Sequence, residues 1–330
     1  MWLKNLTGFN ESKESIHKNI TLKDGKLKSL VNTKEYHYGT LETLSLKELR
    51  ERVKNSNVKK GKLKLQAISA DVKALHLDPN NAKALFQVAS QFNLLEMLGA
   101  NITPEMGIEQ YENDHTQGPI CAICAGAGTI YRNYFVEIDG QVGQCETKQI
   151  DCLADIGKAL GNENNTLWEM RNGYALLKED GLYAINRKLK GMSEDEVDEL
   201  REKLRIGLMW DTQVTLDDCK HRVSQAYCSA LPVSYVGFVL EIWKPFASLI
   251  LEATYEATIC AGILNGDNRV YLTLVGGGVF GNDLEWICSA MERAILKYMD
   301  YELDVKIVNY GAIYGDVSDL IKRFEKIKRK

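Results

Sequence analysis

The chain has 330 residues, of which 45% are apolar and 26% charged, and its formal net charge is −4. This length allows one large domain, or one domain with a smaller appendage. The composition is that of an ordinary soluble globular protein. A net negative charge argues against a general nucleic-acid binder, because such proteins normally present a positively charged surface. No nucleic-acid partner is therefore expected.

The sequence also predicts no membrane partner. The first residues, MWLKNLTGFNESKE, lack the apolar core of a signal peptide, and no uncharged apolar run is as long as a membrane span. Cysteines are scattered through apolar segments, which favours reduced, buried thiols in a cytosolic protein. Cys121 and Cys124 form a CxxC pair without a second pair or a matching CxH spacing, so we expect neither a metal site nor a cofactor.

Residues 1–75 differ in character from the rest of the chain. They are rich in lysine and hold few long apolar runs, which predicts an N-terminal extension or small cap on a main domain of residues 76–330. Within this segment Ser45 and Glu48 fit a capping box that opens a helix. Because no catalytic side chains cluster here, a chain that starts near Val72 is expected, if it folds, to retain some activity.

The main domain shows a repeating α/β pattern. The apolar segment 83–98 predicts a strand that ends near Asn93, and residues 172–186 predict a strand–turn–strand unit with its turn at 179–181. Pro245 suits the first turn of a long helix, and residues 305–309 form a last buried strand. These elements predict a mixed or mainly parallel sheet flanked by helices.

The stretch VYLTLVGGGVFGNDLEWI (270–287) is the most informative part of the chain. Six β-favouring residues run into Gly276, Gly277 and Gly278, and an amphipathic helix follows from about Asp283. Successive glycines beside a helix N-terminus expose backbone N–H groups, an arrangement that favours a phosphate or diphosphate. The alternative is a tight turn in which the glycines serve only the backbone geometry.

A second cluster of useful side chains lies between two apolar segments, in FNLLEMLGANITPEMGIEQYENDHTQGP (92–119). Its acidic residues include Glu105, Glu109, Glu112 and Asp114. A carboxylate at such a site can activate a water or hold a ribose hydroxyl, although acidic loops are also commonly just solvated. In an extended stretch, Glu112 and Asp114 would point to the same side.

Together the two clusters resemble a macrodomain, most closely the poly(ADP-ribose) glycohydrolase type. The matching pieces are Gln91-Phe92-Asn93, the loop 104–119, the segment 254–265 and GGGVFGND (276–283), so the resemblance covers roughly residues 80 to 310. The acidic loop lacks the Gly-Gly-Gly run and the Gln-Glu-Glu triplet of that type. It is similar instead to a divergent branch that includes bacterial effector hydrolases acting on ADP-ribosylated protein.

The resemblance implies a macrodomain-like mixed sheet and an ADP-ribosyl hydrolase that cleaves the glycosidic bond at the ribose C1. Asp114 and Glu112 are then the leading catalytic candidates, with Glu105 and Glu109 in reserve. Asn93 would hydrogen-bond the ribose, the 276–281 loop would wrap the diphosphate, and Phe280 would pack against ribose or base. The expected ADP-ribose-binding residues are Gln91, Phe92, Asn93, Thr116, Gln117, Gly276, Gly277, Gly278, Val279, Phe280, Gly281 and Asn282.

The expected partner is ADP-ribose or an ADP-ribosylated protein, with ADP-ribosylated ubiquitin an option if the chain acts as an effector. The compartment is the cytoplasm, of its own cell or of a host. A non-catalytic domain that reads ADP-ribose is the main alternative, since the same glycine loop would serve it. A nicotinamide-dinucleotide enzyme is disfavoured, because the Gly126-Ala127-Gly128-Thr129 stretch lacks a convincing third glycine and acidic partner.

Overall fold

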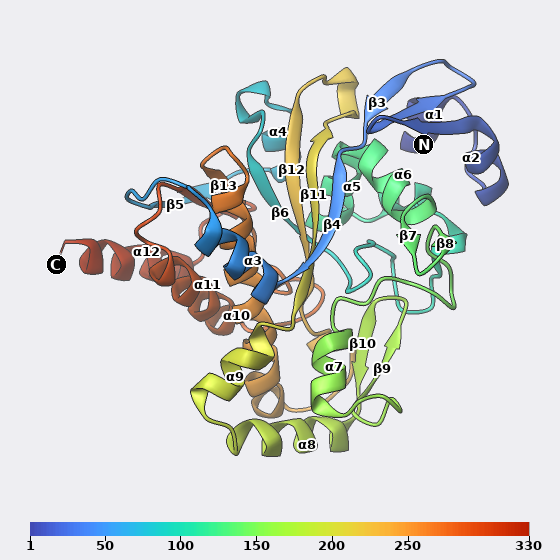
Figure 1. Cartoon of the computed structure of the whole chain (residues 1–330). Coiled ribbons are helices and arrows are strands. Elements are labelled where there is room, and N and C mark those ends of the chain that lie inside the picture. Colours follow the sequence, from blue (N-terminus) through green and yellow to red (C-terminus); the bar gives the residue numbers. More distant parts are fainter. Residues whose placement is uncertain (330) are drawn as a thin grey trace.

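A seven-stranded mixed sheet forms the centre of the protein in the computed structural model, which describes residues 1–329 (Figure 1). The strand order is β4-β11-β12-β6-β13-β14-β5. The strands are β4 (Thr40–Ser45), β5 (Lys64–Ser69), β6 (Leu85–Ala89), β11 (Arg205–Gln213), β12 (Arg222–Cys228), β13 (Arg269–Leu272) and β14 (Asp304–Asn309). Neighbours from β12 to β5 pair in parallel, whereas β11 is antiparallel to both β12 and β4. The predicted mixed sheet flanked by helices is confirmed.

Helices cover both faces of this sheet. On β6 the side chains alternate between the two faces, as they do in any strand. Gln87 donates from Nε2 to Thr258 Oγ1 on one face at 2.9 Å, and the Phe86 ring stacks on His76 on the other, with centroids 3.9 Å apart. The first face carries α3 (Leu46–Asn55), α10 (Leu240–Leu264), α11 (Leu284–Lys297) and α12 (Gly315–Lys328). The second carries α4 (Val72–Leu77), α5 (Gln117–Cys124) and α6 (Gly126–Tyr134).

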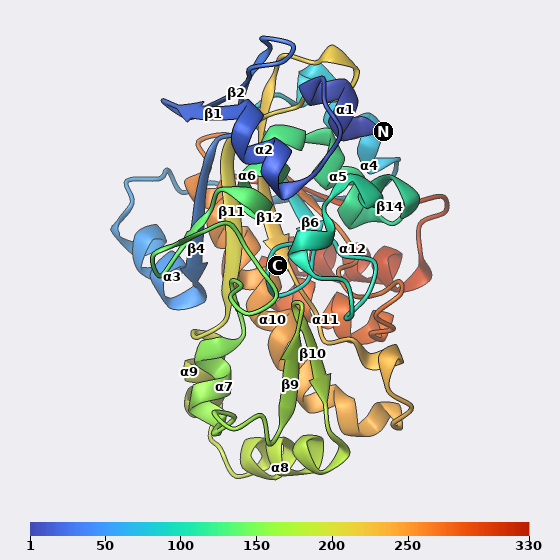
Figure 2. The same ribbon diagram turned by 90° about the vertical axis from the view of Figure 1, so that its right-hand side faces the viewer.

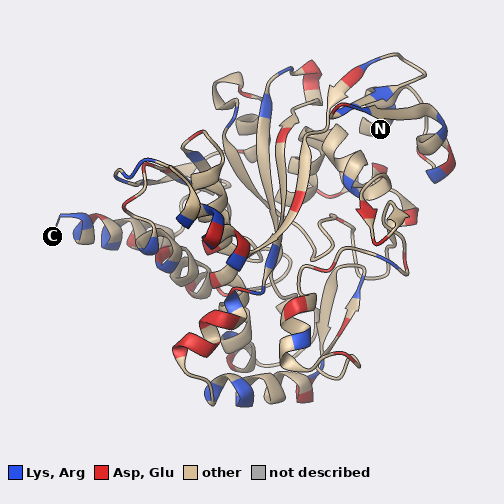
Figure 3. Ribbon diagram, in the orientation of Figure 1, with Lys and Arg blue, Asp and Glu red and all other residues tan. Residues whose placement is uncertain are grey.

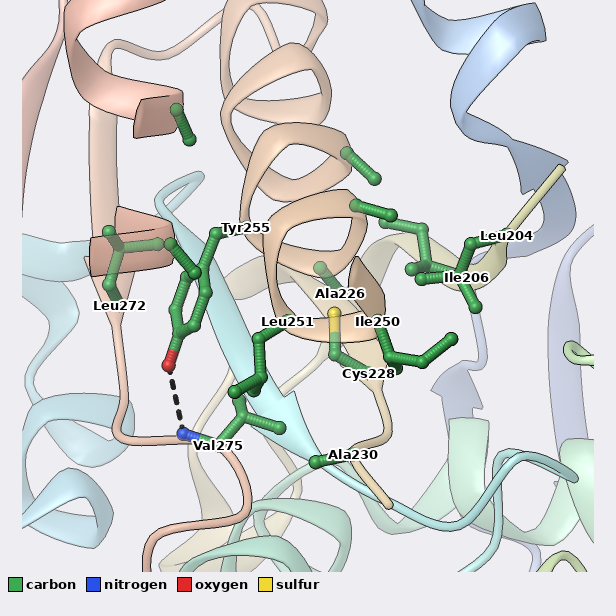
Figure 4. Packing of buried hydrophobic residues seen from close by; sticks show 14 of the residues in the cluster. Leu204, Ile206, Ala226, Cys228, Ala230, Ile250, Leu251, Tyr255, Leu272 and Val275 are labelled. Atoms are coloured by element: carbon green, nitrogen blue, oxygen red, sulfur yellow. Dashed lines mark hydrogen bonds between the residues drawn. The ribbon is translucent and has the colours of Figure 1, made fainter. Parts of the chain in front are cut away.

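Helix α10 is the main core helix. Figure 4 shows Ile250, Leu251 and Tyr255 of this helix packed against strand residues such as Ala226 and Leu272. Its length and mean hydropathy would suit a membrane span, but 83% of its most apolar window is buried within the fold, as in the core helix of a soluble protein. Pro245 lies inside the helix, five residues after its start, rather than in the first turn as predicted.

A smaller helical and hairpin region projects from one end of the sheet (Figure 2). It contains α7 (Ala154–Leu160), β9 (Trp168–Arg171), β10 (Tyr174–Leu177), α8 (Glu179–Lys190) and α9 (Glu194–Arg201). The predicted turn at 179–181 is wrong, because those residues begin α8. The hairpin turns at Asn172 and Gly173, whose φ values of 46° and 81° suit a two-residue turn.

The N-terminal residues form a layer against α6, with Trp2 beside its first residue, Gly126, and His17 beside its last, Tyr134. This layer comprises α1 (Trp2–Thr7), α2 (Lys13–Asn19), β1 (Ile20–Lys23), β2 (Lys26–Ser29) and β3 (Glu35–His37). Short elements complete the fold: β7 (Glu137–Ile138), β8 (Gln141–Val142) and the 3₁₀ helices η1 (Pro79–Asn81), η2 (Pro104–Met106), η3 (Glu109–Asn113), η4 (Leu216–Asp218) and η5 (Val233–Tyr235).

The predicted boundary at residue 75 does not separate two units. Both edge strands of the central sheet, β4 and β5, precede it, as does α3, which packs on α10. The sequence hid them because an edge strand such as β5 buries few side chains and is rich in polar residues between them. A chain that starts near Val72 would therefore lack two strands of its own core sheet. The capping box of Ser45 with Glu48 is confirmed at the start of α3.

Most charged side chains lie on the surface, for example along α9 and the end of α12 (Figure 3). Glu256 of α10 is an exception, with a side chain that is 0% exposed. Its carboxylate pairs with Arg50 of α3 at 2.6 Å, and with Arg293 and Lys297 of α11 at 2.7 Å each. Burial alone would raise the pKa of Glu256, but the hydrogen bonds from Arg50 and Lys297 outweigh it and lower the pKa to about 2. This cluster fastens α3, α10 and α11 to one another.

Candidate functional site

A cleft of about 790 Å³ opens at the carboxyl ends of the parallel strands. Its wall includes a residue that follows each of the five strands: Ala70 after β5, Gln91 after β6, Ala230 after β12, Thr273 after β13 and Tyr310 after β14. Ligands of open α/β sheets bind outside this edge. The volume lies within the range of roughly 300–1,000 Å³ that small-molecule sites occupy.

The glycine loop, residues 273–283, forms one side of the cleft and is fixed from the core. The Tyr255 hydroxyl donates to the Thr273 carbonyl at 2.7 Å. It also accepts from the Val275 N–H at 3.0 Å (Figure 4). The loop then closes on itself, because the Asn282 N–H donates to the Gly276 carbonyl at 2.9 Å. Gly276 has φ of +79°, which favours glycine, and a Cβ there would meet the Ala230 Cβ at 2.5 Å.

Several N–H groups of this loop are left free, four of them between residues 276 and 280. Within residues 1–329, the backbone N–H groups of Gly276, Gly278, Val279 and Phe280 donate to no acceptor, and all four residues line the cleft. A Cβ placed on Gly278 would meet nothing within 4 Å. Consecutive unhindered N–H groups of this kind favour an anion such as a phosphate.

Of the four acids predicted in the acidic loop, Asp114 lines the cleft. It stands just before α5, and its Oδ1 accepts from the Thr116 N–H at 2.8 Å. Residues 109–113 coil into the 3₁₀ helix η3 instead of extending, so the expected pairing of Glu112 with Asp114 on one side is wrong. Glu112 instead accepts from the Trp2 N–H at 3.1 Å, on the N-terminal layer.

The two reserve acids also lie outside the wall of the cleft. Both oxygens of Glu105 accept from the Glu146 N–H at 3.0 Å. Glu109 faces the N-terminal layer, where burial, then Glu11 and Glu112, raise its pKa. Neither position reaches the glycine loop.

The Gln91-Phe92-Asn93 segment contributes less than the sequence suggested. Gln91 lines the cleft, but Phe92 is a core residue, 2% exposed, and Asn93 is fully buried. The Asn93 amide donates to Gln149 Oε1 at 2.8 Å and its Oδ1 accepts from the Leu95 N–H at 3.0 Å. The reason is that β6 ends at Ala89, so the chain has already turned away from the sheet edge.

Three other predicted binding residues hold the walls of the cleft in place. Thr116, Gln117 and Asn282 line it. The Gln117 amide accepts from the Ala89 N–H at 2.8 Å and donates to the Gln87 carbonyl at 3.0 Å, which ties α5 to β6. Asn282 donates to the Leu231 carbonyl at 2.8 Å and so ties the glycine loop to the segment after β12. Gly277 lines the cleft, whereas Gly281 packs beside Ser234 and is not among the lining residues.

An aromatic cluster stands next to the glycine loop. Tyr174, Tyr235 and Phe280 all line the cleft, and their ring centroids lie 5.4 to 5.6 Å apart. Phe280 therefore belongs to the wall of the cleft, and its contact with ribose or base stays a prediction. Flat apolar faces of this kind suit a nucleoside.

Glu96 is an acidic residue of the cleft that the sequence did not predict, as Tyr174 and Tyr235 are its unpredicted aromatic residues. Glu96 lines the cleft, yet it is only 4% exposed. Burial raises the pKa of this carboxyl well above its usual value, Arg132 opposes that shift and Asp114 adds to it. Its only signal in the sequence is an acid inside the apolar run LLEML (94–98), where a charged residue is costly to bury.

The Gly126–Thr129 stretch is no phosphate loop. It lies inside α6, where a Cβ on Gly126 would meet the Trp2 ring at 2.7 Å and one on Gly128 would meet Thr212 Oγ1 at 2.8 Å. These glycines permit close packing. Throughout the described chain, residues 1–329, no three His, Cys, Asp or Glu side chains are grouped to hold a metal ion, and all eight cysteines are free.

No protein-family model matches the chain, and no curated protein matches it. Among solved structures, the chain is similar to poly(ADP-ribose) glycohydrolase from Thermomonospora curvata, with 11% identity over 94% of this chain and 95% of that one and a TM-score of 0.46. It is also similar to poly(ADP-ribose) glycohydrolase from Deinococcus radiodurans in complex with ADP-ribose, with 10% identity over 87% and 95% of the two chains and a TM-score of 0.47. Similarity this distant concerns overall architecture and assigns no activity.

Proposed function

We propose that the protein is an ADP-ribosyl hydrolase, which releases ADP-ribose from a modified protein by cleaving the glycosidic bond at the ribose C1. One observation supports this most. The cleft is lined by the glycine loop, with its free N–H groups, and also by two carboxyl side chains, those of Glu96 and Asp114. The loop suits an anion, and the carboxyl groups suit chemistry at a sugar.

The anion that fits best is a diphosphate flanked by nucleoside groups. Free N–H groups on Gly276, Gly278, Val279 and Phe280 can donate to several phosphate oxygens at once, and each such charge-assisted bond contributes about 1.5–3 kcal/mol. The ring of Phe280, with Tyr174 and Tyr235, supplies an apolar wall beside them. In ADP-ribose the groups follow one another as a base, a ribose, two phosphates and a second ribose, so its diphosphate is flanked in this way.

The carboxyl groups favour hydrolysis over binding alone. Cleavage at C1 passes through an oxocarbenium-like state, which a nearby carboxylate stabilises while a second group handles the proton. A domain that only reads ADP-ribose needs the loop and the aromatic wall but has no use for a carboxyl group buried without a partner. Keeping Glu96 buried reduces the stability of the fold, and such local costs are typical of functional sites.

The modified protein and the compartment belong to the proposal as well. ADP-ribosylated ubiquitin is the first partner to test, since the acidic loop is similar to that of effector hydrolases. A cytoplasmic setting, in the protein's own cell or in a host, suits eight free cysteines, six of which are buried.

Two measurements on the full chain test the proposal. Calorimetric titration with free ADP-ribose should show binding. Incubation with peptides that carry ADP-ribose on serine, arginine or glutamate, with ADP-ribosylated ubiquitin, and with poly(ADP-ribose) should release ADP-ribose from at least one substrate. Binding without release from any of them would identify a reader domain instead. Absence of both would overturn the proposal.

A further inference from the structure

Glu96 has a carboxyl group that the fold itself does not use. Within the described residues, 1–329, neither of its oxygens accepts a hydrogen bond, and Oε1 is fully enclosed. Buried carboxyl groups normally accept hydrogen bonds, because a buried acceptor without a hydrogen bond destabilises the fold by about 1–3 kcal/mol or more. An unpartnered carboxyl group in the wall of a cleft therefore points to a partner that arrives with the ligand.

The absence of a side chain at Gly118 makes room for this carboxyl group. Gly118 is the second residue of α5, and a Cβ there would collide with Glu96 Oε2 and with the Ala89 carbonyl. The Glu96 carboxyl group thus occupies the space directly beside the first turn of α5. Asp114 lies three residues before Gln117, the first residue of α5, and lines the same cleft.

The backbone of Glu96 is held firmly. Its N–H donates to the Tyr111 hydroxyl at 2.9 Å. Arg132 supports the preceding turn, because its Nε donates to the Leu94 carbonyl at 3.1 Å while its guanidinium lies 3.6 Å from the centroid of the Tyr227 ring. Nη1 of Arg132 is also enclosed without a partner among residues 1–329. Positioned groups of this kind suit proton transfer.

We infer that Glu96, rather than an acid of the 105–114 loop, is the catalytic residue that exchanges the proton with the leaving group. The inference rests on the proposed hydrolase function. In the first step the Glu96 carboxyl group gives its proton to the oxygen or nitrogen of the leaving side chain as the bond to C1 breaks, and the bonding pair stays with the leaving atom. In the second, water adds through its oxygen to C1 and returns a proton to the Glu96 carboxylate.

The surroundings of Glu96 raise the pKa of its carboxyl group and so favour the acid form that the first step needs. The titratable or charged groups that face it are Tyr111, Asp114, Cys121, Arg132, Tyr174 and Tyr227. Burial raises the pKa of the tyrosines and of Cys121, so these groups are neutral near pH 7. Activity should therefore fall on the alkaline side as Glu96 loses its proton.

The test compares Glu96→Gln with Glu105→Gln, a matched control in the nearby loop whose carboxylate does not line the cleft. Glu96→Gln should lower kcat by a factor on the order of a hundred or more, as for the loss of a positioned acid. Its Kd for free ADP-ribose should stay within about threefold of the parent value. The alkaline limb of the pH profile should disappear from the remaining activity. Glu105→Gln should match the parent in all three measurements.

Folding is checked separately. Because its pKa is raised in the folded state, Glu96 keeps a proton there at pH values where the unfolded chain has lost it. Glu96 therefore lowers the free energy of unfolding increasingly as pH rises above about 4.3. Glu96→Gln should consequently be at least as stable as the parent at pH 8. If it fails to fold, Glu96→Met, which removes the carboxyl group at similar volume, replaces it. An active parent with full turnover in either folded variant overturns this inference alone, whereas a parent that hydrolyses no substrate overturns the proposed function and the inference with it.

Discussion

Replacing Gly278 by valine offers the sharpest test of the glycine loop. Gly278 is exposed in the wall of the cleft, its φ lies outside the left-handed region, and an added Cβ would meet nothing within 4 Å. The substitution should therefore leave the fold intact, with a change in unfolding free energy within ~0.5 kcal/mol. The branched side chain would instead fill the space over the free N–H groups of Gly278 and Val279.

The size of the effect follows from those two groups. Each charge-assisted hydrogen bond to a phosphate contributes about 1.5–3 kcal/mol, so losing two removes about 3–6 kcal/mol. At about 1.4 kcal/mol per factor of ten, the Kd for ADP-ribose should rise by roughly a hundred- to ten-thousand-fold. Calorimetric titration measures this directly, and thermal unfolding confirms that the variant is folded.

Gly237→Val is the matched control. A Cβ on Gly237 also meets nothing within 4 Å, its φ is likewise unstrained, and the residue does not line the cleft. It should bind ADP-ribose as the parent does. If folded Gly278→Val protein binds ADP-ribose within threefold of the parent, the glycine loop does not hold the diphosphate and the reasoning from its free N–H groups is wrong.

Three further outcomes are expected. Asp114→Asn should reduce turnover by a factor on the order of a hundred with little change in ADP-ribose affinity. If steady-state kinetics and calorimetric titration show turnover and affinity reduced by the same factor, Asp114 binds the ribose instead of acting in catalysis. Glu256→Gln should lower the free energy of urea unfolding by about 3–5 kcal/mol, since it leaves three cations without their buried partner. Because the pKa of Glu256 is lowered to about 2, its contribution to stability is present above about pH 4.3 and is lost as pH falls toward 2. The difference in unfolding free energy between the parent and Glu256→Gln should therefore shrink between about pH 4.3 and about pH 2, and a constant difference would contradict the assignment. Removing residues 1–70 should give an unfolded or aggregated chain by size-exclusion chromatography, because it deletes β4, α3 and β5; a soluble, cooperatively folded product would show that these elements are dispensable.

Local sequence patterns predicted several elements well. The Ser45 capping box opens a helix where expected, because a cap depends only on residues three apart. The buried strand near 305–309 and the helix after Asp283 also follow from short-range periodicity. The turn predicted at 179–181 failed because Gly181 serves a close contact with the backbone of Leu167, a residue brought near only by folding.

The sequence by itself determined the glycine loop between a strand and a helix, the mixed α/β pattern, and the presence of an acidic loop before α5, since each depends on neighbouring residues. Only the tertiary structure decided which acids meet that glycine loop. Asp114 reaches the cleft and Glu105, Glu109 and Glu112 do not, because η2 and η3 turn them toward Glu146 and the N-terminal layer. Glu96 reaches it because Gly118, 22 positions further along the chain, leaves space for a carboxyl group at the start of α5. Contacts between residues so far apart leave no periodic signal in the sequence, because they arise from how the sheet and its helices pack.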